Sequence, residues 1–202
     1  MIGRIAAIER ETRSHARPLL VIVSGPPATG KTTLAERLAP ELGLFLLAKD
    51  DIKERLGDRL PAKSLSDSQR LGDATFHLLF HLANHAIRSG VSLLIESPFY
   101  RGVHEAKLAA IVAGSRAVLI HCYAPQDVAA RRFRARAERG ERHPVHFDKE
   151  QPFALLGIPE EDWDRRARPL DLDIPTLVLD TTEGYVDDIA PILEFIRSSV
   201  SA

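Results

Sequence analysis

The feature that most constrains this chain is an apolar run that leads directly into a loop of glycine and proline. Residues 21–33 read VIVSGPPATGKTT, and a run with helical character, TLAERLAPEL, overlaps their end. Residues 25–32 match the pattern G-x-x-x-x-G-K-[ST], whose backbone N–H groups can surround phosphate oxygens when a strand precedes and a helix follows. The stretch therefore predicts a nucleotide-binding loop.

Each position of this loop has a physical role. Gly25 and Gly30 allow the backbone to curl, and the helix that begins near Lys31 adds the positive end of its dipole. Lys31 can reach the β- and γ-phosphates of ATP, and the hydroxyl of Thr32 can bind Mg²⁺. We expect the cofactor to be bound by Gly25, Pro26, Pro27, Ala28, Thr29, Gly30, Lys31, Thr32 and Thr33.

Apolar runs alternate with amphipathic runs along almost the whole chain. We predict strands at 19–24, 44–48, 91–95, 117–122 and 175–180, and helices at about 31–40, 51–60, 67–89, 103–113, 125–138, 159–167 and 185–198. The strands are almost continuously apolar, which is typical of a parallel sheet covered on both faces. This alternation predicts a doubly wound α/β fold with its ligand site at the carboxyl ends of the strands.

The composition suits one soluble globular domain without a strongly charged partner. Of the 202 residues, 45% are hydrophobic and 27% charged, and the formal net charge is −1, so no global charge steers the chain toward nucleic acid or an anionic membrane. No apolar segment approaches the roughly 20 residues of a membrane span. The single cysteine, Cys122, lies in the apolar run VLIHCY and is expected to be a small buried hydrophobe, which fits a reducing, cytoplasmic location.

Three regions are expected. Residues 1–17 are predicted to form an N-terminal helical extension, and residues 18–202 the main domain. Within that domain, an arginine-rich helix followed by a polar, proline-interrupted stretch predicts a lid at about 125–158.

The predicted strand at 44–48 is followed by KDDIK, which brings Asp50 and Asp51 to the sheet edge near the γ-phosphate. An aspartate there can accept the proton of an incoming hydroxyl and orient it for in-line attack. Aspartate is also favoured as a helix N-cap. We expect Asp50 to be the base and Asp51 the cap, although the sequence leaves the choice between them open. Lys53, one turn later, can neutralise charge on the phosphates or on the acceptor.

The predicted strand at 91–95 runs into Glu96 in the stretch LLIESPFYRG. A carboxylate at this edge can hold the water shell of a magnesium ion. The alternative is a glutamate that ends the strand in solvent. Phe99, Tyr100 and Arg101 could line an acceptor pocket, with Arg101 as a candidate substrate contact.

Six arginines lie between residues 131 and 142. At helical spacing Arg132, Arg136 and Arg139 share one face. They could clamp the phosphates of ATP and stabilise charge during transfer, with Arg139 on the substrate, because guanidinium groups bind phosphate in a bidentate manner. A solvated basic face is the alternative.

Together, the stretches GPPATGKTT, KDDIK, LLIES and APQDVAARRFRARAERG resemble a group of P-loop kinases within an AAA-domain family. The group includes phage-type polynucleotide 5′-hydroxyl kinases, and zeta-toxin-like, chloramphenicol-phosphotransferase-like and gluconate-kinase-like proteins are related to it. The resemblance covers roughly residues 18–182. It implies a P-loop NTPase fold with a five-stranded parallel sheet in the order 2-3-1-4-5.

The resemblance also implies roles for individual residues. The family's Asp-x-x-Arg motif falls on Asp50 and Lys53, and lysine lacks the bidentate fork of arginine. Glu96 stands where the family more often has aspartate. The family's lid arginines fall on Arg132, expected near the adenine, and Arg136, expected on the phosphates. The run DTT at 180–182 resembles the family's loop beside the adenine.

Histidine recurs every fourth residue on the helix predicted at 67–89, at His77, His81 and His85. We expect Leu71, Leu78 and Leu82 to centre the apolar face of this helix, with the histidines at its boundary. A wall of the acceptor pocket that includes His81, or a metal-binding ladder, are the alternatives.

Two further histidines and a tryptophan have ambiguous surroundings. His143 and His146 could touch a substrate or be ordinary loop residues. Trp163 is expected to pack in the interior, and stacking on an acceptor base is the alternative.

Three functions remain open on sequence grounds. The favoured one is an ATP- and Mg²⁺-dependent kinase that phosphorylates a hydroxyl of a small molecule or nucleoside, with Lys31, Asp50 and Arg136 as catalytic residues and Thr32 and Glu96 as metal ligands. A polynucleotide 5′-hydroxyl kinase is less favoured, because end binding normally uses a basic channel. The third is an ATPase switch acting on a protein partner. Neither the acceptor nor the oligomeric state can be read from the sequence.

Overall fold

The structure of the protein, a computed structural model, describes residues 17–150, 155, 157–184 and 186–200. The predicted N-terminal extension, apart from its last residue, lies outside the described residues.

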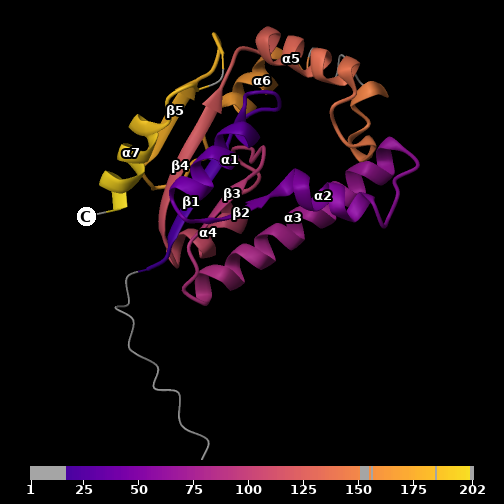
Figure 1. Cartoon of the computed structure of the whole chain (residues 1–202). Helices are drawn as coiled ribbons and strands as arrows, with labels where there is room; N and C mark the ends of the chain where they lie inside the picture. Colours follow the sequence, from indigo (N-terminus) through magenta and orange to yellow (C-terminus); the bar gives the residue numbers. More distant parts are fainter. Residues whose placement is uncertain (1–16, 151–154, 156, 185, 201–202) are drawn as a thin grey trace, which may run out of the picture.

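Five strands form one parallel sheet, as predicted (Figure 1). They are β1 (Leu19–Ser24), β2 (Phe45–Ala48), β3 (Leu93–Glu96), β4 (Arg116–Tyr123) and β5 (Thr176–Asp180). Their order in the sheet is β2-β3-β1-β4-β5, and every neighbouring pair is parallel. The P-loop NTPase architecture and its strand order are therefore confirmed.

Helices cover both faces of this sheet. The α-helices are α1 (Lys31–Glu41), α2 (Lys49–Gly57), α3 (Leu65–Arg88), α4 (Glu105–Ala113), α5 (Gln126–Arg139), α6 (Glu160–Ala167) and α7 (Ala190–Val200). One apolar core lies between the sheet and α3 and α4, and the other between the sheet and α1 and α7. A third, smaller cluster joins α5 to α6 and contains the buried Trp163, which confirms its predicted packing role.

After α5, the segment predicted to be part of a lid continues to α2 and α3. Two short 3-10 helices, η1 (Pro144–His146) and η2 (Asp148–Glu150), follow α5. Figure 1 shows this segment arching from α5 toward the ends of α2 and α3. Among the residues that the structure describes, no helix combines the length and hydropathy of a membrane span.

The prediction that Asp51 caps the second helix was wrong. Helix α2 begins at Lys49, directly after β2, and its N-cap is Ala48, which provides no side-chain cap. Asp50 and Asp51 both lie in the first turn, where a carboxylate is still favoured by the helix dipole. The exposed Asp51 side chain lies 3.8 Å from Arg55, one turn further along.

The predicted apolar face of α3 was also wrong. The side chains that α3 buries include Thr75, Leu79, Ala83 and Ile87. Leu78 and Leu82 are 36% and 42% exposed instead, and they share the outer part of the helix with the exposed His81. Two apolar stripes run along this helix, and only packing against the sheet decides which one enters the core.

Cys122 is buried in β4, as predicted, and its backbone supports the glycine loop. A Cβ atom added to Gly25 would lie 2.0 Å from the carbonyl oxygen of Cys122, and φ at Gly25 is 135°. Only glycine fits this close approach between the loop and the sheet.

We expect Gly25→Ala to lower the free energy of unfolding much more than Gly43→Ala. The first substitution drives a Cβ into a backbone carbonyl of β4, and the expected loss is at least about 3 kcal/mol. At Gly43, φ is 62° and no atom lies within 4 Å of the added Cβ. Only the left-handed backbone cost of about 1–2 kcal/mol then applies. Denaturant unfolding of both variants measures the difference, and equal losses would contradict the close approach at Gly25.

Candidate active site

The ends of β1, β2 and β3 bring the predicted site residues to one edge of the sheet. Glu96, the last residue of β3, is in register with Val23 of β1 and with Ala48 of β2. The glycine loop follows Val23 after one residue, and Asp50 follows Ala48 after one residue. The loop, Asp50 and Glu96 therefore meet because the three strands pair in this register.

The loop itself has the backbone of an anion-binding turn. Gly25, Ala28 and Gly30 all have positive φ, at 135°, 63° and 85°. Positive φ values within such a tight turn can direct successive backbone N–H groups toward its inside, where they can bind an anion. The hydroxyl of Thr29 donates to the carbonyl of Pro26 at 2.8 Å and holds the turn closed. The left-handed Ala28 was not expected, since alanine gives no sequence signal for that conformation.

Lys31 lies at the start of α1 and is buried. Its ammonium donates to the carbonyl of Pro26 at 2.7 Å, within the loop that would receive the phosphates. Burial lowers the pKa of Lys31, against the opposing effect of Glu96 and Asp50. When phosphates bind in the loop, the ammonium of Lys31 can give up its hydrogen bond to the Pro26 carbonyl and bind phosphate oxygens in its place.

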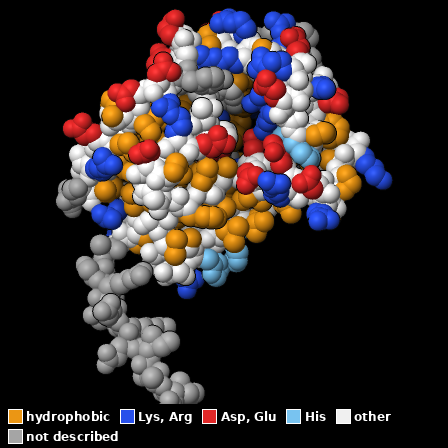
Figure 2. Space-filling view, in the orientation of Figure 1, with side chains coloured by type: hydrophobic (Ala, Val, Ile, Leu, Met, Phe, Trp, Pro, Cys, Tyr) orange, Lys and Arg blue, Asp and Glu red, His pale blue; other side chains and the backbone are white. Residues whose placement is uncertain are grey.

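Two neighbouring cavities, of about 500 Å³ and 400 Å³, occupy the space between the loop, α2 and the lid. The smaller one is lined by the glycine loop and Lys31, and the larger one extends along α1 and β2. Figure 2 shows a hollow below the lid, with both basic and acidic side chains around it. Both cavities are lined by Thr32, Asp50, Glu96, Arg136 and Arg142.

Thr32 and Glu96 form an oxygen pair that suits magnesium. The Thr32 hydroxyl donates to Glu96 Oε2 at 3.5 Å, and Glu96 is only 3% exposed. Burial raises the pKa of Glu96 to about 7, although the Lys31 ammonium lowers it. A hydroxyl and a carboxylate facing one cavity are hard oxygen donors of the kind Mg²⁺ binds, so these residues fit the expected metal. The solvent-exposed interpretation of Glu96 is excluded.

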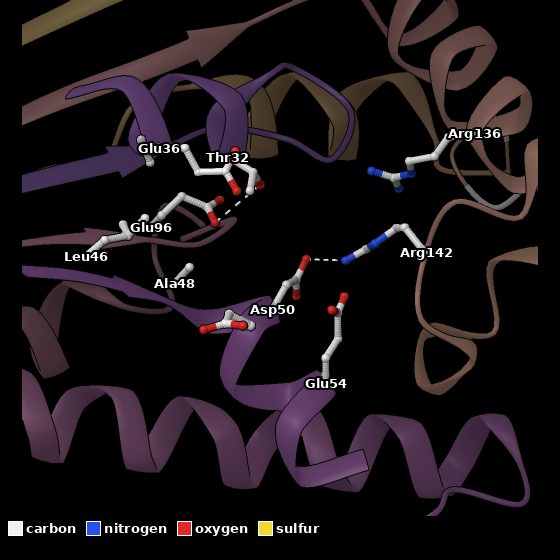
Figure 3. Close-up of a pocket in the computed structure, with 11 residues that line it drawn as sticks. Thr32, Glu36, Leu46, Ala48, Asp50, Glu54, Glu96, Arg136 and Arg142 are labelled. Atoms are coloured by element: carbon white, nitrogen blue, oxygen red, sulfur yellow. Dashed lines mark hydrogen bonds and ion pairs between the residues drawn. The ribbon is translucent and has the colours of Figure 1, made fainter. Parts of the chain in front are cut away.

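Asp50 projects from the first turn of α2 into the same cavities (Figure 3). Its Oδ1 lies 3.1 Å from the ammonium of Lys49, and its Oδ2 accepts a hydrogen bond from Arg142. Burial alone would raise the pKa of Asp50, but the positive charges of Arg142 and Lys49 outweigh it and hold the pKa well below its ordinary value. The carboxylate is therefore charged over the whole physiological range.

The two expected nucleotide arginines lie on α5. Arg136 lines both cavities and binds Asp148 at 3.2 Å. Arg132 donates to the backbone carbonyls of Thr181 and Thr182 at 2.6 Å and 3.2 Å. Arg132 and the DTT loop at 180–182, which were both expected beside the adenine, are thus in direct contact with each other.

The residues predicted to contact the substrate lie in different surroundings. Lys53 is buried and donates to the hydroxyl of Ser68 at 2.7 Å, and burial together with Lys49 lowers its pKa to about 8. Arg101 pairs with Asp171 at 2.8 Å, which ties it to the segment after α6.

Two more of these candidates are exposed. Arg139 pairs with Glu141. His81 lies on the outside of α3, with its ring 4.4 Å from that of His85. Within the described part of the chain, no group of three or more histidine, cysteine or acidic side chains is placed to hold a metal ion.

Sequence reasoning missed the residues that surround Asp50 from the lid. Arg142 was recognised only as one of six arginines, and it follows the helix end at Gly140 in a stretch without periodicity. His146 lies 3.1 Å from Arg142 and 2.9 Å from Glu54 of α2. The contacts of Arg142 with Asp50 and of His146 with Glu54 each join residues 92 positions apart, so no local pattern could have revealed them.

Comparison with known proteins agrees with this architecture. A protein family described as an AAA domain matches residues 20–152. A provisionally assigned kinase from Chloroflexus aurantiacus J-10-fl is 34% identical, with a TM-score of 0.77, over 91% of this chain and 98% of that one. No curated protein matches the chain.

More distant structures share the fold. APE1195 is 20% identical, with a TM-score of 0.60, over 91% of this chain and 97% of its own. The Mycobacterium tuberculosis APS kinase CysC, solved with AMPPNP and APS, is 21% identical, with a TM-score of 0.54, over 91% of this chain and 99% of its own. With its glycine loop, its strand order and a family match over residues 20–152, the chain belongs to the AAA-domain family of P-loop kinase-like proteins.

Proposed function

We propose that this protein transfers the γ-phosphate of ATP to a hydroxyl group of a small molecule or nucleoside. The observation that carries the proposal is the position of Asp50, which lines the same two cavities as Thr32 and Glu96. A carboxylate beside the phosphate loop can take a proton from an alcohol that attacks the terminal phosphorus.

Asp50 suits this role better than its neighbour Asp51. The side chain of Asp50 is 31% exposed and held between two cations, whereas that of Asp51 is 69% exposed and lies near Arg55. A base must be held in a defined orientation relative to the attacking hydroxyl, because misplacement by about 1 Å can cost a factor of about 100 in rate. Only Asp50 is held in that way.

The remaining roles follow from charge and position. ATP with Mg²⁺ supplies the phosphoryl group when bound. Lys31 and Arg136 would neutralise the charge that develops on the phosphate oxygens. Thr32 and Glu96 would hold the metal, and Arg132 together with the loop at 180–182 would contact the adenine.

The proposed transfer is direct. The acceptor oxygen forms a bond to the γ-phosphorus while the bond from that phosphorus to the oxygen of the leaving ADP breaks, and the hydroxyl proton passes to Asp50. No phosphorylated enzyme is formed. Lid residues above the cavities would exclude water and limit wasteful hydrolysis.

The direct test is a screen of hydroxyl compounds, including sugars, nucleosides and antibiotics, for ADP release that depends on the added compound. Acceptor-dependent release supports the proposal. Steady ATP hydrolysis without an acceptor, or labelling restricted to oligonucleotides that end in a 5′-hydroxyl, would contradict it.

We expect Lys31→Ala to reduce phosphoryl transfer by at least about 100-fold, because removing one preorganised donor to the developing charge costs about that much. The readout is acceptor-dependent ADP release at saturating ATP. Lys63→Ala is the matched control, since Lys63 is an exposed lysine before α3, and it should retain full activity. Similar losses in both variants would contradict the role of Lys31.

We expect Asp50→Asn to bind ATP normally and to lose turnover by about 100- to 10,000-fold, the usual range for a general base. The amide preserves size and removes the proton acceptor. Calorimetric titration with a non-hydrolysable ATP analogue measures binding, and ADP release measures turnover.

Asp51→Asn is the adjacent control. It removes the same charge one residue away and should remain active. Near-normal turnover in the Asp50 variant would show that Asp50 is not the base.

A further inference from the structure

The stretch that we call the lid tip, residues 142–148, is attached to α2 and α3. The hydroxyl of Ser68 on α3 donates to the carbonyl of Val145 at 2.5 Å, and Ser68 itself accepts from the buried Lys53. His143 lies 3.1 Å from Asp58 at the end of α2. The lid tip is therefore held by the two helices that follow β2, the first of which carries Asp50.

Packing also fixes the position of the lid tip. Val145 is 4% exposed and lies against Gly57, the last residue of α2. A Cβ atom added to Gly57 would lie 2.8 Å from Cγ2 and 2.9 Å from Cβ of Val145. The glycine thus permits a contact between backbone and side chain that no larger residue would allow.

This attachment sets the position of Arg142. The guanidinium of Arg142 binds Asp50 (Figure 3). It also lies 3.1 Å from His146 Nε2 and 3.5 Å from Asp148. Its side chain is only 20% exposed. Arg142 therefore has three partners, two of them within the lid tip, that hold its planar group in one orientation.

We propose that Arg142 is a positioning residue for Asp50, and that the lid tip serves to carry it. The inference rests on the proposed function, in which Asp50 is the base. The first residue of α2, Lys49, holds one carboxylate oxygen and Arg142 holds the other. A carboxylate has about four lone-pair directions, so an acceptor hydroxyl can still bind Asp50 while the two cations fix its plane.

Arg142 suits this task better than the other cations nearby. Lys49 belongs to the same helical turn as Asp50 and cannot set the position of that turn. The ammonium of Lys53 is directed to Ser68, and Arg136 is directed to Asp148. Among these cations, only Arg142 reaches Asp50 from a separate part of the chain and offers the rigid planar fork of a guanidinium.

The lid consequently divides into two parts with different tasks. Helix α5 carries Arg132 and Arg136 toward the loop at 180–182 and the phosphate side of the cavities. The lid tip carries Arg142 to the proposed base.

The pKa of Asp50 reports on its contact with Arg142, and several other charged or titratable groups also influence that pKa. Lys49, Lys53 and Glu54 face it from α2, Lys31 from α1, Glu96 from β3, and Arg136 from α5. Tyr100 faces it from the loop after β3. His146 faces it from the lid tip, and burial lowers the pKa of His146 to about 3, so that His146 is neutral near pH 7. The lid tip therefore contributes one permanent positive charge at Asp50, that of Arg142.

The test combines three variants of the full chain with one control. Arg142→Ala removes the guanidinium, and Arg142→Lys keeps the charge without the fork. Gly57→Ala changes no charge and favours the helix, but it pushes Val145 and the lid tip away from α2. Arg131→Ala is the control, because Arg131 is an exposed arginine of α5 that pairs with Asp127 at 3.3 Å.

The first readout needs no turnover. The Asp50 carboxyl carbon, labelled with ¹³C and assigned with Asp50→Asn, is titrated by NMR. Removing a positive charge favours the protonated carboxyl, so the pKa of Asp50 should rise in Arg142→Ala, rise less in Arg142→Lys, and rise in Gly57→Ala. It should stay at the wild-type value in Arg131→Ala.

The second readout is kinetic. Arg142→Ala should lower kcat about 10- to 100-fold, as expected for a misplaced catalytic group. Its KM for ATP should stay within about twofold of the wild-type value, because a positioning residue does not bind the nucleotide. The acid limb of kcat/KM should move to higher pH in step with the NMR titration, and Arg142→Lys should recover part of the loss.

The outcomes separate this inference from the proposed function. An Asp50 titration that is the same in the wild type and in Arg142→Ala would overturn the inference, even if turnover still required Asp50. A loss confined to KM for ATP would also overturn it, since Arg142 would then be a nucleotide ligand. If no acceptor supports turnover, the proposed function fails, and the titration still decides whether Arg142 holds Asp50.

Discussion

The site depends on the register of three parallel strands. Glu96 is opposite Val23 on one side and Ala48 on the other, so the residues that follow β1 and β2 emerge beside the end of β3. A shift of one residue would turn every side chain of a strand to the other face of the sheet. The buried apolar side chains of β1 and β3 thus determine where the glycine loop and the two carboxylates meet.

The charges of the site form one coupled set. Asp50 lies between Lys49 and Arg142, and Asp148 between Arg142 and Arg136. Buried charges are tolerated when they are paired, and removing one partner leaves the other uncompensated. The predicted lid is therefore part of the electrostatic structure of the site, because it brings a cation to the residue that we propose as the base.

Short-range sequence patterns predicted most of the fold and located the residues at the centre of the candidate site. The apolar runs located all five strands, and the glycine loop located Lys31 and Thr32. The errors arose where three-dimensional packing decides between local options. The N-cap of α2 is Ala48, not Asp51, because α2 begins directly at the end of β2. Helix α3 buries Leu79 and Ala83 and leaves Leu78 and Leu82 exposed, because only one of its two apolar stripes faces the sheet.

By itself, the sequence determined the phosphate loop, the parallel sheet and the acidic residues at its edge, because each depends on neighbours along the chain. The tertiary structure alone decided that the lid tip lies on α2 and that Arg142 reaches Asp50, 92 positions away. Contacts of that kind follow from the way separate helices pack. The sequence of the lid tip has no periodic pattern, so it does not indicate which surface of the protein the lid tip packs against.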